Sequence, residues 1–213
     1  METMLELGDI TKSFPQQRVL EGISLTVGDG ESVAIMGPSG SGKSTLLHCM
    51  SGVLVPDQGE VLFDGRDVAA MSDAERSRLR LEHFGFIFQD GQLLPELTAT
   101  ENVALPQIMR GVPRSQAHDE AIDMLTRLGL GAYVDRYPGQ LSGGQGQRVA
   151  IARALAGPPS VVFADEPTAA LDQATGHEVM QQIVAVCQKF GVALVVVTHD
   201  PKIADWCSRR VEI

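Results

Sequence analysis

The sequence predicts an α/β fold built around a parallel sheet. Short apolar runs alternate along the chain with segments of helical periodicity, and four of the runs are almost continuously apolar. Such runs are typical of strands that are covered on both faces of a parallel sheet. The four expected strands are residues 32–36, 84–88, 161–164 and 192–197. A length of 213 residues fits one domain, or one domain with a subdomain.

Capping residues place two of the helices. Ser72 and Glu75 have the spacing of a capping box, which opens a basic helix. Asp172 is placed to cap a later helix, and Gly191 ends it. The apolar side chains of this later helix fall on one face, which predicts that it packs on the sheet. They are Val179, Met180, Ile183, Val184 and Cys187.

The region from about residue 90 to residue 148 is expected to be a helical insertion. It lacks strand-like runs, and residues 119–128 have a helical pattern that stops at Gly129. Another helical run follows at residues 147–156. We therefore expect helices alone between the second and third strands of the sheet.

Composition and charge exclude several classes of protein. Apolar residues make up 44% of the chain and charged residues 21%, as in globular proteins. The formal net charge of −10 disfavours a nucleic-acid partner, because that affinity comes mainly from clustered Lys and Arg. The N-terminal residues lack the pattern of a signal peptide. The longest clean apolar run, residues 192–197, is far shorter than the roughly 20 residues of a membrane helix.

The three cysteines are widely spaced along the chain. They are Cys49, Cys187 and Cys207. Their number and spacing fit neither a disulfide framework nor a zinc site. We expect buried or half-buried thiols in a reducing compartment.

A phosphate-binding loop is indicated between the first strand and the helix expected at residues 44–50. The pattern G-x-x-x-x-G-K-S occurs there in the strand–loop–helix context that the motif requires. In such a loop backbone N–H groups surround phosphates, while Lys43 reaches the outer phosphates and Ser44 binds Mg²⁺. The alternative is a glycine-rich turn with a surface lysine, which rarely has this spacing. The loop comprises Gly37, Pro38, Ser39, Gly40, Ser41, Gly42, Lys43, Ser44 and Thr45.

Polar residues follow the other three strands. Asp165 and Glu166 come directly after the third strand, and the edge where strands end is where α/β sheets bind ligands. Asp165 is placed to support Mg²⁺, and Glu166 to orient or deprotonate an attacking water. His199 and Gln89 follow the fourth and second strands and are expected at the same edge. Local sequence leaves open that each is only a solvated residue at a strand end.

A second glycine-rich helix start is formed by Leu141-Ser-Gly-Gly-Gln145. Ser142 is able to cap the helix, and Gly143 and Gly144 allow the backbone to approach an anion, with Gln145 next. The physical argument gives a second phosphate contact as one interpretation and an ordinary helix start as the other.

In this order the motifs closely resemble those of ABC-transporter nucleotide-binding subunits, across essentially the whole chain. The elements are GPSGSGKST, Gln89, LSGGQ, VVFADEPT, Leu171-Asp172 and Thr198-His199-Asp200. The resemblance implies a P-loop NTPase (RecA-like) core with a small N-terminal β subdomain and a helical subdomain. The implied division of the single ATP-binding domain 1–213 is a core of 1–89 and 149–213 and a helical subdomain of 90–148.

The resemblance also implies ATP hydrolysis with Mg²⁺ in a dimer, where each ATP lies between the P-loop of one chain and the LSGGQ segment of the other. It implies that Gln89 senses Mg²⁺ and the water, and that His199 holds the γ-phosphate. Ser142 and Gly144 would meet the partner's γ-phosphate, and Asp172 is implied to be among the nucleotide-binding residues. Phe14 looks like the aromatic residue that stacks on adenine, the alternative being an ordinary packed phenylalanine.

Within the family the chain looks most like the subfamily of lipoprotein-releasing, macrolide-exporting and haem-exporting systems. This implies a cytoplasmic subunit, peripheral on the inner face of the membrane, that binds an integral membrane permease near residues 89–98. Two alternatives are a regulatory switch that activates an extracytoplasmic hydrolase, as in cell-division relatives, and a soluble ABC-type ATPase. Ala169 and Gly146 depart from the family pattern, and neither removes a catalytic group. The sequence also stops at residues 210–213, where relatives generally continue into a further strand or hairpin.

Overall fold

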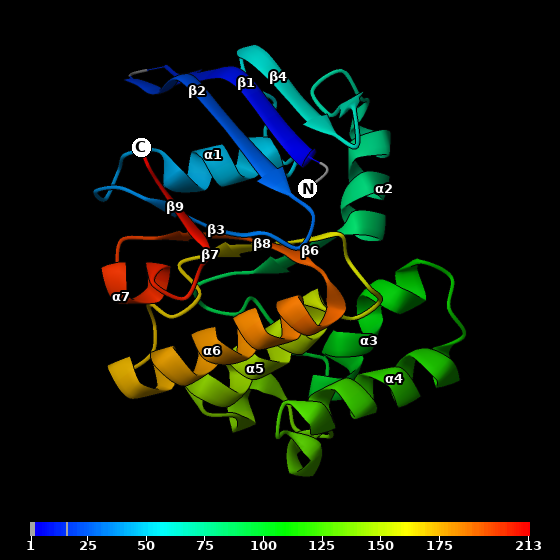
Figure 1. Ribbon diagram of the computed structural model, residues 1–213. Helices are drawn as coiled ribbons and strands as arrows, with labels where there is room; N and C mark the ends of the chain where they lie inside the picture. Colours follow the sequence, from blue (N-terminus) through cyan, green and yellow to red (C-terminus); the bar gives the residue numbers. More distant parts are fainter. Residues whose placement is uncertain (1–2, 16) are drawn as a thin grey trace.

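The computed structural model describes residues 3–15 and 17–213, which form a parallel sheet, an antiparallel sheet and helices packed on both (Figure 1). The parallel sheet has the strand order β6-β7-β8-β3-β9, and each neighbouring pair is parallel. Its strands are β3 (Ser32–Met36), β6 (Phe84–Ile87), β7 (Val161–Asp165), β8 (Ala193–Thr198) and β9 (Arg209–Glu212). Every residue of β8 is buried, which confirms the expectation of strands covered on both faces.

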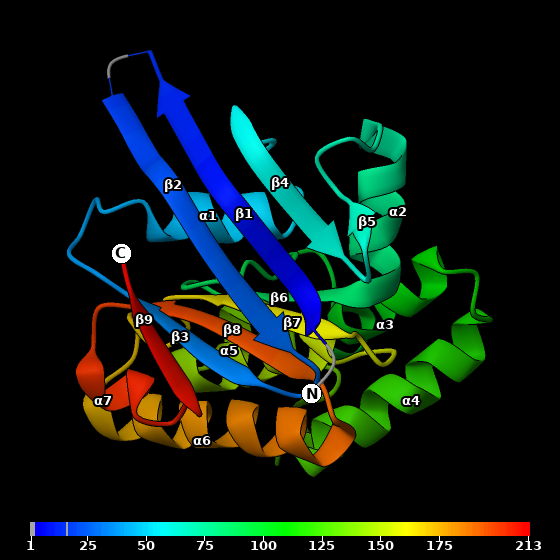
Figure 2. The same ribbon diagram turned by 45° about the horizontal axis from the view of Figure 1, so that its top comes forward.

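The antiparallel sheet lies on the other side of helix α1 (Lys43–Met50) from the parallel sheet (Figures 1 and 2). Its strands, in the order β2-β1-β4-β5, are β1 (Thr3–Phe14), β2 (Gln17–Gly28), β4 (Gln58–Phe63) and β5 (Arg66–Asp67). One hydrophobic core joins the two sheets and α1, and it includes Leu5, Leu46 and Phe163. This sheet is the small N-terminal β subdomain of the expected fold class.

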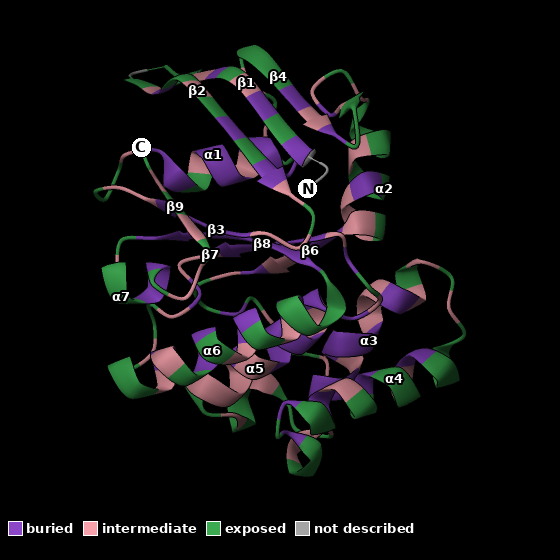
Figure 3. Ribbon diagram, in the orientation of Figure 1, coloured by how far each residue is buried: buried purple, intermediate pink, exposed green. Residues whose placement is uncertain are grey.

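Helices cover the opposite face of the parallel sheet. They are α3 (Ala99–Met109), α4 (Arg114–Arg127), α5 (Gly143–Ala154) and α6 (Gln173–Phe190). Figure 3 shows their buried residues facing one another and the sheet, where a second core forms around Val103, Leu125 and Ile183. The remaining helices are α2 (Asp73–His83), α7 (Pro201–Ala204) and the 3₁₀ turns Gly131–Tyr133 and Pro138–Gln140.

Several helix and strand boundaries differ from the sequence expectations. The helix expected at residues 119–128 begins at Arg114, and the one expected at 147–156 begins at Gly143 because Ser142 caps it. Strand β6 ends at Ile87, so Gln89 lies beyond the strand rather than at its end. Helix α5 runs without a break through residues 148 and 149, where the proposed division between core and helical subdomain falls.

The cysteines are free thiols. Cys49 and Cys187 are buried and Cys207 is half-buried. Burial raises the pKa of Cys49 to about 11 and the pKa of Cys187 and of Cys207 to about 12, so all three are protonated at neutral pH. Among the described residues, no helix has both the length and the apolar character needed to cross a membrane.

Candidate nucleotide-binding site

An open cleft of about 980 Å³ lies where the strands of the parallel sheet end. Its walls come from three places that the sequence singled out: the P-loop, Gln89 and the pair Glu166 and His199. Ala169 also lines the cleft. The structure therefore brings together residues that lie up to 162 positions apart, between Gly37 and His199, as expected for the carboxyl edge of an α/β sheet.

The P-loop is shaped by glycines and ends in an uncapped helix. Gly40 and Gly42 have φ values of 83° and 96°, which favour glycine, and a Cβ on Gly42 would lie 2.8 Å from Val19 Cγ1. Gly42 is the N-cap residue of α1 and makes no side-chain cap. The first N–H groups of α1 are therefore left without a capping side chain at the positive end of the helix dipole, an arrangement suited to a phosphate.

Lys43 is held inside the loop. Its side chain is largely buried, and Nζ donates hydrogen bonds to the carbonyl oxygens of Gly37 and Pro38, each at 2.9 Å. These carbonyls are weaker partners for an ammonium than a phosphate anion is. The ammonium group of Lys43 is thus already placed in the loop, where an anion would attract it.

Ser44 and Asp165 form a pair of oxygen ligands. Ser44 Oγ donates to Asp165 Oδ1 at 2.9 Å, across 121 residues of sequence. Burial raises the pKa of Asp165, and the hydrogen bond from Ser44 opposes that change. A half-buried carboxylate next to a hydroxyl is the chemistry that a hard divalent cation prefers.

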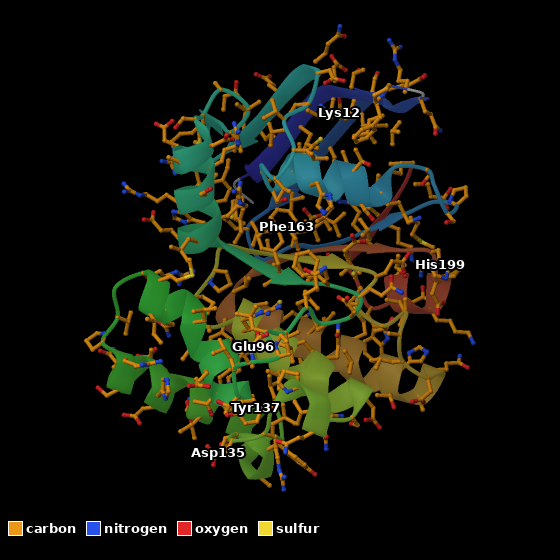
Figure 4. The ribbon with its side chains drawn as sticks, turned by 180° about the vertical axis from the view of Figure 1, so that it is seen from behind. Lys12, Glu96, Asp135, Tyr137, Phe163 and His199 are labelled. Carbon is orange, nitrogen blue, oxygen red and sulfur yellow. The ribbon has the colours of Figure 1, made fainter. Side chains whose placement is uncertain are left out.

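Glu166 and His199 are in direct contact. His199 Nδ1 lies 2.9 Å from Glu166 Oε1, and a tautomer with hydrogen on Nδ1 donates to the carboxylate. Glu166 has a φ of 45°, unusual for a non-glycine residue, and its N–H donates to Val197 O at 3.0 Å. The side chain of His199 is 64% exposed at the end of β8, near α7 (Figure 4). The turn after β7 therefore directs Glu166 toward β8 and the cleft.

The glycine-rich segment at residues 142–145 lies in a different cleft. Ser142 is the N-cap of α5, where Gln145 N donates to Ser142 Oγ at 3.3 Å and Ser142 N donates to Gln145 Oε1 at 2.8 Å. A Cβ on Gly144 would lie 2.8 Å from Thr175 Cγ2, so a larger residue there would require the side chain of Thr175 on α6 to shift. This second cleft, of about 450 Å³, also includes Asp172. The P-loop cleft and the 142–145 segment of one chain are therefore separate surfaces.

Two other predicted residues also lie apart from the P-loop cleft. Phe14 ends strand β1 on the antiparallel sheet, and the residue is 44% exposed. Asp172 caps α6 by accepting from the N–H groups of Ala174 and Thr175, each at 3.1 Å. The hydrogen bond from Thr175 lowers the pKa of Asp172.

Sequence reasoning missed two polar residues of α5 that contact the site's loops. Gln147 donates to Phe88 O and Pro167 O, and Arg153 donates to Gln92 O and Gly91 O. A polar residue within a helix carries no signal of its own. Helical spacing would have placed Gln147 on the face that also buries Ala150 and Ala154.

Comparisons with known proteins identify the family of the chain. Residues 20–169 match the family described as ABC transporter. The ATP-binding protein LolD of the lipoprotein-releasing system of Shewanella frigidimarina is 46% identical over 99% of this chain and 90% of its own length. The macrolide export ATP-binding/permease protein MacB of Marinobacter nauticus is also 46% identical over 99% of this chain, which spans 33% of that protein.

A solved structure gives the same result. The ATP-binding cassette MJ0796, in a dimeric post-hydrolysis state with ADP and phosphate, superposes with a TM-score of 0.89 at 39% identity, covering 99% of this chain and 94% of that one. The fold and the cleft thus define a P-loop ATPase. The chain belongs to the ABC transporter family, as an ATP-hydrolysing nucleotide-binding subunit of the group that includes the lipoprotein-releasing and macrolide-export ATPases. The family resemblance and the α/β fold class are confirmed.

Proposed function

We propose that two copies of this chain bind two ATP molecules between them and hydrolyse each to ADP and phosphate to drive movement in a membrane permease. One observation carries the proposal: the P-loop cleft and the segment at residues 142–145 are separate, open surfaces of one chain. A second copy would bring its Ser142 and Gly144 to the ATP held by the first. The solved dimers of the similar cassette MJ0796 support this arrangement.

Within the cleft, Lys43 would exchange its two carbonyl partners for the β- and γ-phosphates. Glu166 would accept a proton from water while the water oxygen bonds to the γ-phosphorus and the bond to the β-phosphate oxygen breaks. His199 would donate to the γ-phosphate. The hydrogen bond from His199 engages only Oε1 of Glu166, so Oε2 would be the oxygen that accepts the proton.

Mg²⁺ would be held by the oxygen atoms of Ser44, Asp165 and Gln89. Among the described residues no group of three or more His, Cys, Asp or Glu side chains could hold a metal, so the remaining ligands would be phosphate oxygens and water. Bound there, the ion would neutralise charge on the transferred phosphoryl group. Phe14 would stack on adenine, and Asp172 would lie at the interface between the two copies.

Replacing Glu166 with Gln tests the catalytic proposal. We expect Glu166→Gln to bind ATP normally and to hydrolyse it at least about 100-fold more slowly, because a general base supplies about that factor or more. Steady-state phosphate release measures this, with Glu60→Gln on exposed β4 as an isosteric control that keeps the wild-type rate. Hydrolysis by Glu166→Gln at the wild-type rate would remove Glu166 from its role.

The partner surface is proposed at residues 89–98 and the adjoining groove. This groove, of about 380 Å³, includes Phe86, Phe88 and Gln92 and three arginines, Arg80, Arg110 and Arg153. Burial lowers the pKa of each arginine, and in the described part of the chain none of them has a carboxylate within 4.0 Å. An apolar segment of a membrane subunit that carries an acidic side chain would complement it.

Purification from detergent-solubilised native membranes, followed by mass spectrometry, tests the partner. We expect a stoichiometric integral membrane protein to remain bound, and the chain to be peripheral on the inner face of the membrane. Arg110→Glu should release that protein, whereas Arg66→Glu on β5 should not. Recovery from the soluble fraction alone would overturn the transporter role while leaving the ATPase chemistry intact. The relatives do not favour the hydrolase-activating switch as an alternative.

A further inference from the structure

A single buried amide contacts the residues next to both Gln89 and Glu166. Gln147 lies on α5, one turn after the helix start at Ser142, and is only 4% exposed. Its Nε2 donates at 3.0 Å to the carbonyl of Phe88, which precedes Gln89, and at 2.7 Å to the carbonyl of Pro167, which follows Glu166. An amide nitrogen carries two hydrogens, so these two contacts use its full donor capacity.

Both contacted loops need such support. The segment after β6 leaves regular structure at Ile87, and Glu166 holds a φ of 45° that costs free energy for a non-glycine residue. Gly91 in the first loop packs close to Gln147: a Cβ there would lie 3.4 Å from Gln147 Oε1. The side chain of Gln147 is thus enclosed between the two loops. Rotation away from Pro167 would remove the hydrogen bond to that carbonyl, whereas the carbonyl of Phe88 also accepts from Gly91 N at 3.0 Å.

We propose that Gln147 is a positioning residue for ATP hydrolysis, which fixes Gln89 and Glu166 relative to each other through the backbone on either side of them. The inference rests on the proposed roles of those two residues. Because Gln147 belongs to the helix that Ser142 begins, it also joins the segment proposed to contact the second ATP to the catalytic residues of its own cleft. Contact of Ser142 with the other nucleotide would then set the geometry of the chain's own site.

The test compares the same substitution at two buried glutamines. Gln147→Met keeps the length and apolar packing of the side chain but removes both donors. Gln107→Met makes the same change at a glutamine of α3 that is 8% exposed. The amide of Gln107 donates to Glu120 on α4 rather than to either loop. Gln107 has no part in the proposed site, so Gln107→Met should keep the wild-type kcat and KM.

For Gln147→Met we expect kcat to fall about 10- to 100-fold, since displacements near 1 Å in an active site cost up to about 100-fold in rate. The KM for ATP should stay within about threefold of the wild type, because Lys43 and the P-loop are untouched. Gln147→Asn, which is one methylene shorter, keeps the amide polarity but withdraws the amide from both carbonyls, and should show the same split. Thermal unfolding shows which of the two variants keeps the wild-type melting temperature. If that variant also has the wild-type kcat, the proposal is overturned.

A double-mutant cycle separates this inference from the proposed function. If Gln147 acts through Glu166, Gln147→Met in a Glu166→Gln background should slow the residual hydrolysis by less than about twofold. Full additivity of the two losses would overturn the positioning role. Wild-type activity in Glu166→Gln alone would refute the proposed function instead, whatever Gln147→Met does.

Discussion

At the scale of single residues, Lys43 offers the most direct test of nucleotide binding. Its ammonium is buried against two carbonyls, and phosphates would replace them with stronger charge-assisted bonds. We predict that Lys43→Ala weakens ATP binding at least about tenfold, equivalent to about 1.4 kcal/mol. Isothermal titration calorimetry measures this, with Lys189→Ala on α6 as a control. Undiminished affinity in Lys43→Ala would exclude the lysine from the phosphate site.

Spacing in the sequence was enough to place the P-loop, Asp165, Glu166 and His199 along one sheet edge, because strand ends in a parallel sheet converge. Their individual roles remain predictions. Gln147 could not be found this way, since its partners are backbone carbonyls 59 and 20 residues away. Such contacts depend on how loops pack in three dimensions, which local patterns do not encode.

At the scale of helices and strands, two helices begin with a serine capping box, and only one of them lies in the proposed site. Ser72 caps α2 and Ser142 caps α5. We predict that Ser72→Ala and Ser142→Ala each lower the free energy of unfolding by about 1 kcal/mol. Only Ser142→Ala should also slow ATP hydrolysis, because Ser142 would contact the second ATP. Equal ATPase rates in the two variants would remove Ser142 from the interface.

The packing of β6 on α5 depends on a glycine. A Cβ on Gly85 would lie 2.2 Å from the carbonyl oxygen of Ala154, a backbone atom that cannot move aside alone. We predict that Gly85→Ala lowers the free energy of unfolding by about 1–3 kcal/mol in urea titrations, as overpacking does. Gly139→Ala is the control, since a Cβ there meets nothing within 4 Å. Equal stability of the two variants would contradict this packing.

The sequence predicted four of the five strands of the parallel sheet and the helices capped by Ser72, Ser142 and Asp172, but not α3. Pro106 lies inside this helix, and its buried positions include the polar residues Thr100, Asn102 and Gln107. The proline and the buried polar residues interrupt the helical spacing of apolar residues that would predict a helix. Thr98 and Glu101 form a capping box at its start, which is the signal that could have located it. Contacts with α4 and α5 evidently override the proline.

At the scale of the whole molecule, an ion pair between Arg209 and Glu31 connects the edge strand β9 to the rest of the chain. Arg209 Nε donates to Glu31 Oε1 at 2.6 Å, and Gly28 N donates to Glu31 Oε2 at 2.8 Å. Burial alone would raise the pKa of Glu31, but these hydrogen bonds and the charge of Arg209 outweigh it and lower the pKa. Because its pKa is lowered on folding, Glu31 stabilises the fold at pH values above its usual pKa near 4.5. This stabilisation is lost as the pH falls through the lowered pKa of the folded state.

Glu31→Gln should therefore cost about 1 kcal/mol of unfolding free energy at pH 7, a small value because the pair is partly exposed. The difference from the wild type should shrink as the pH falls below 4.5. Chemical denaturation across this range measures it, with the exposed Glu21→Gln as a control. A difference that stays constant with pH would show that the pair does not stabilise the fold by its charge.

ATP hydrolysis as proposed requires two chains that close over ATP. The most direct test is light scattering of Glu166→Gln with and without saturating ATP and Mg²⁺. Without nucleotide we expect a mass near 22.8 kDa, and with ATP about twice that, since the slow variant would hold its nucleotide between two copies. The further change Lys43→Ala should abolish the dimer. A mass that stays at 22.8 kDa with ATP bound would contradict the account.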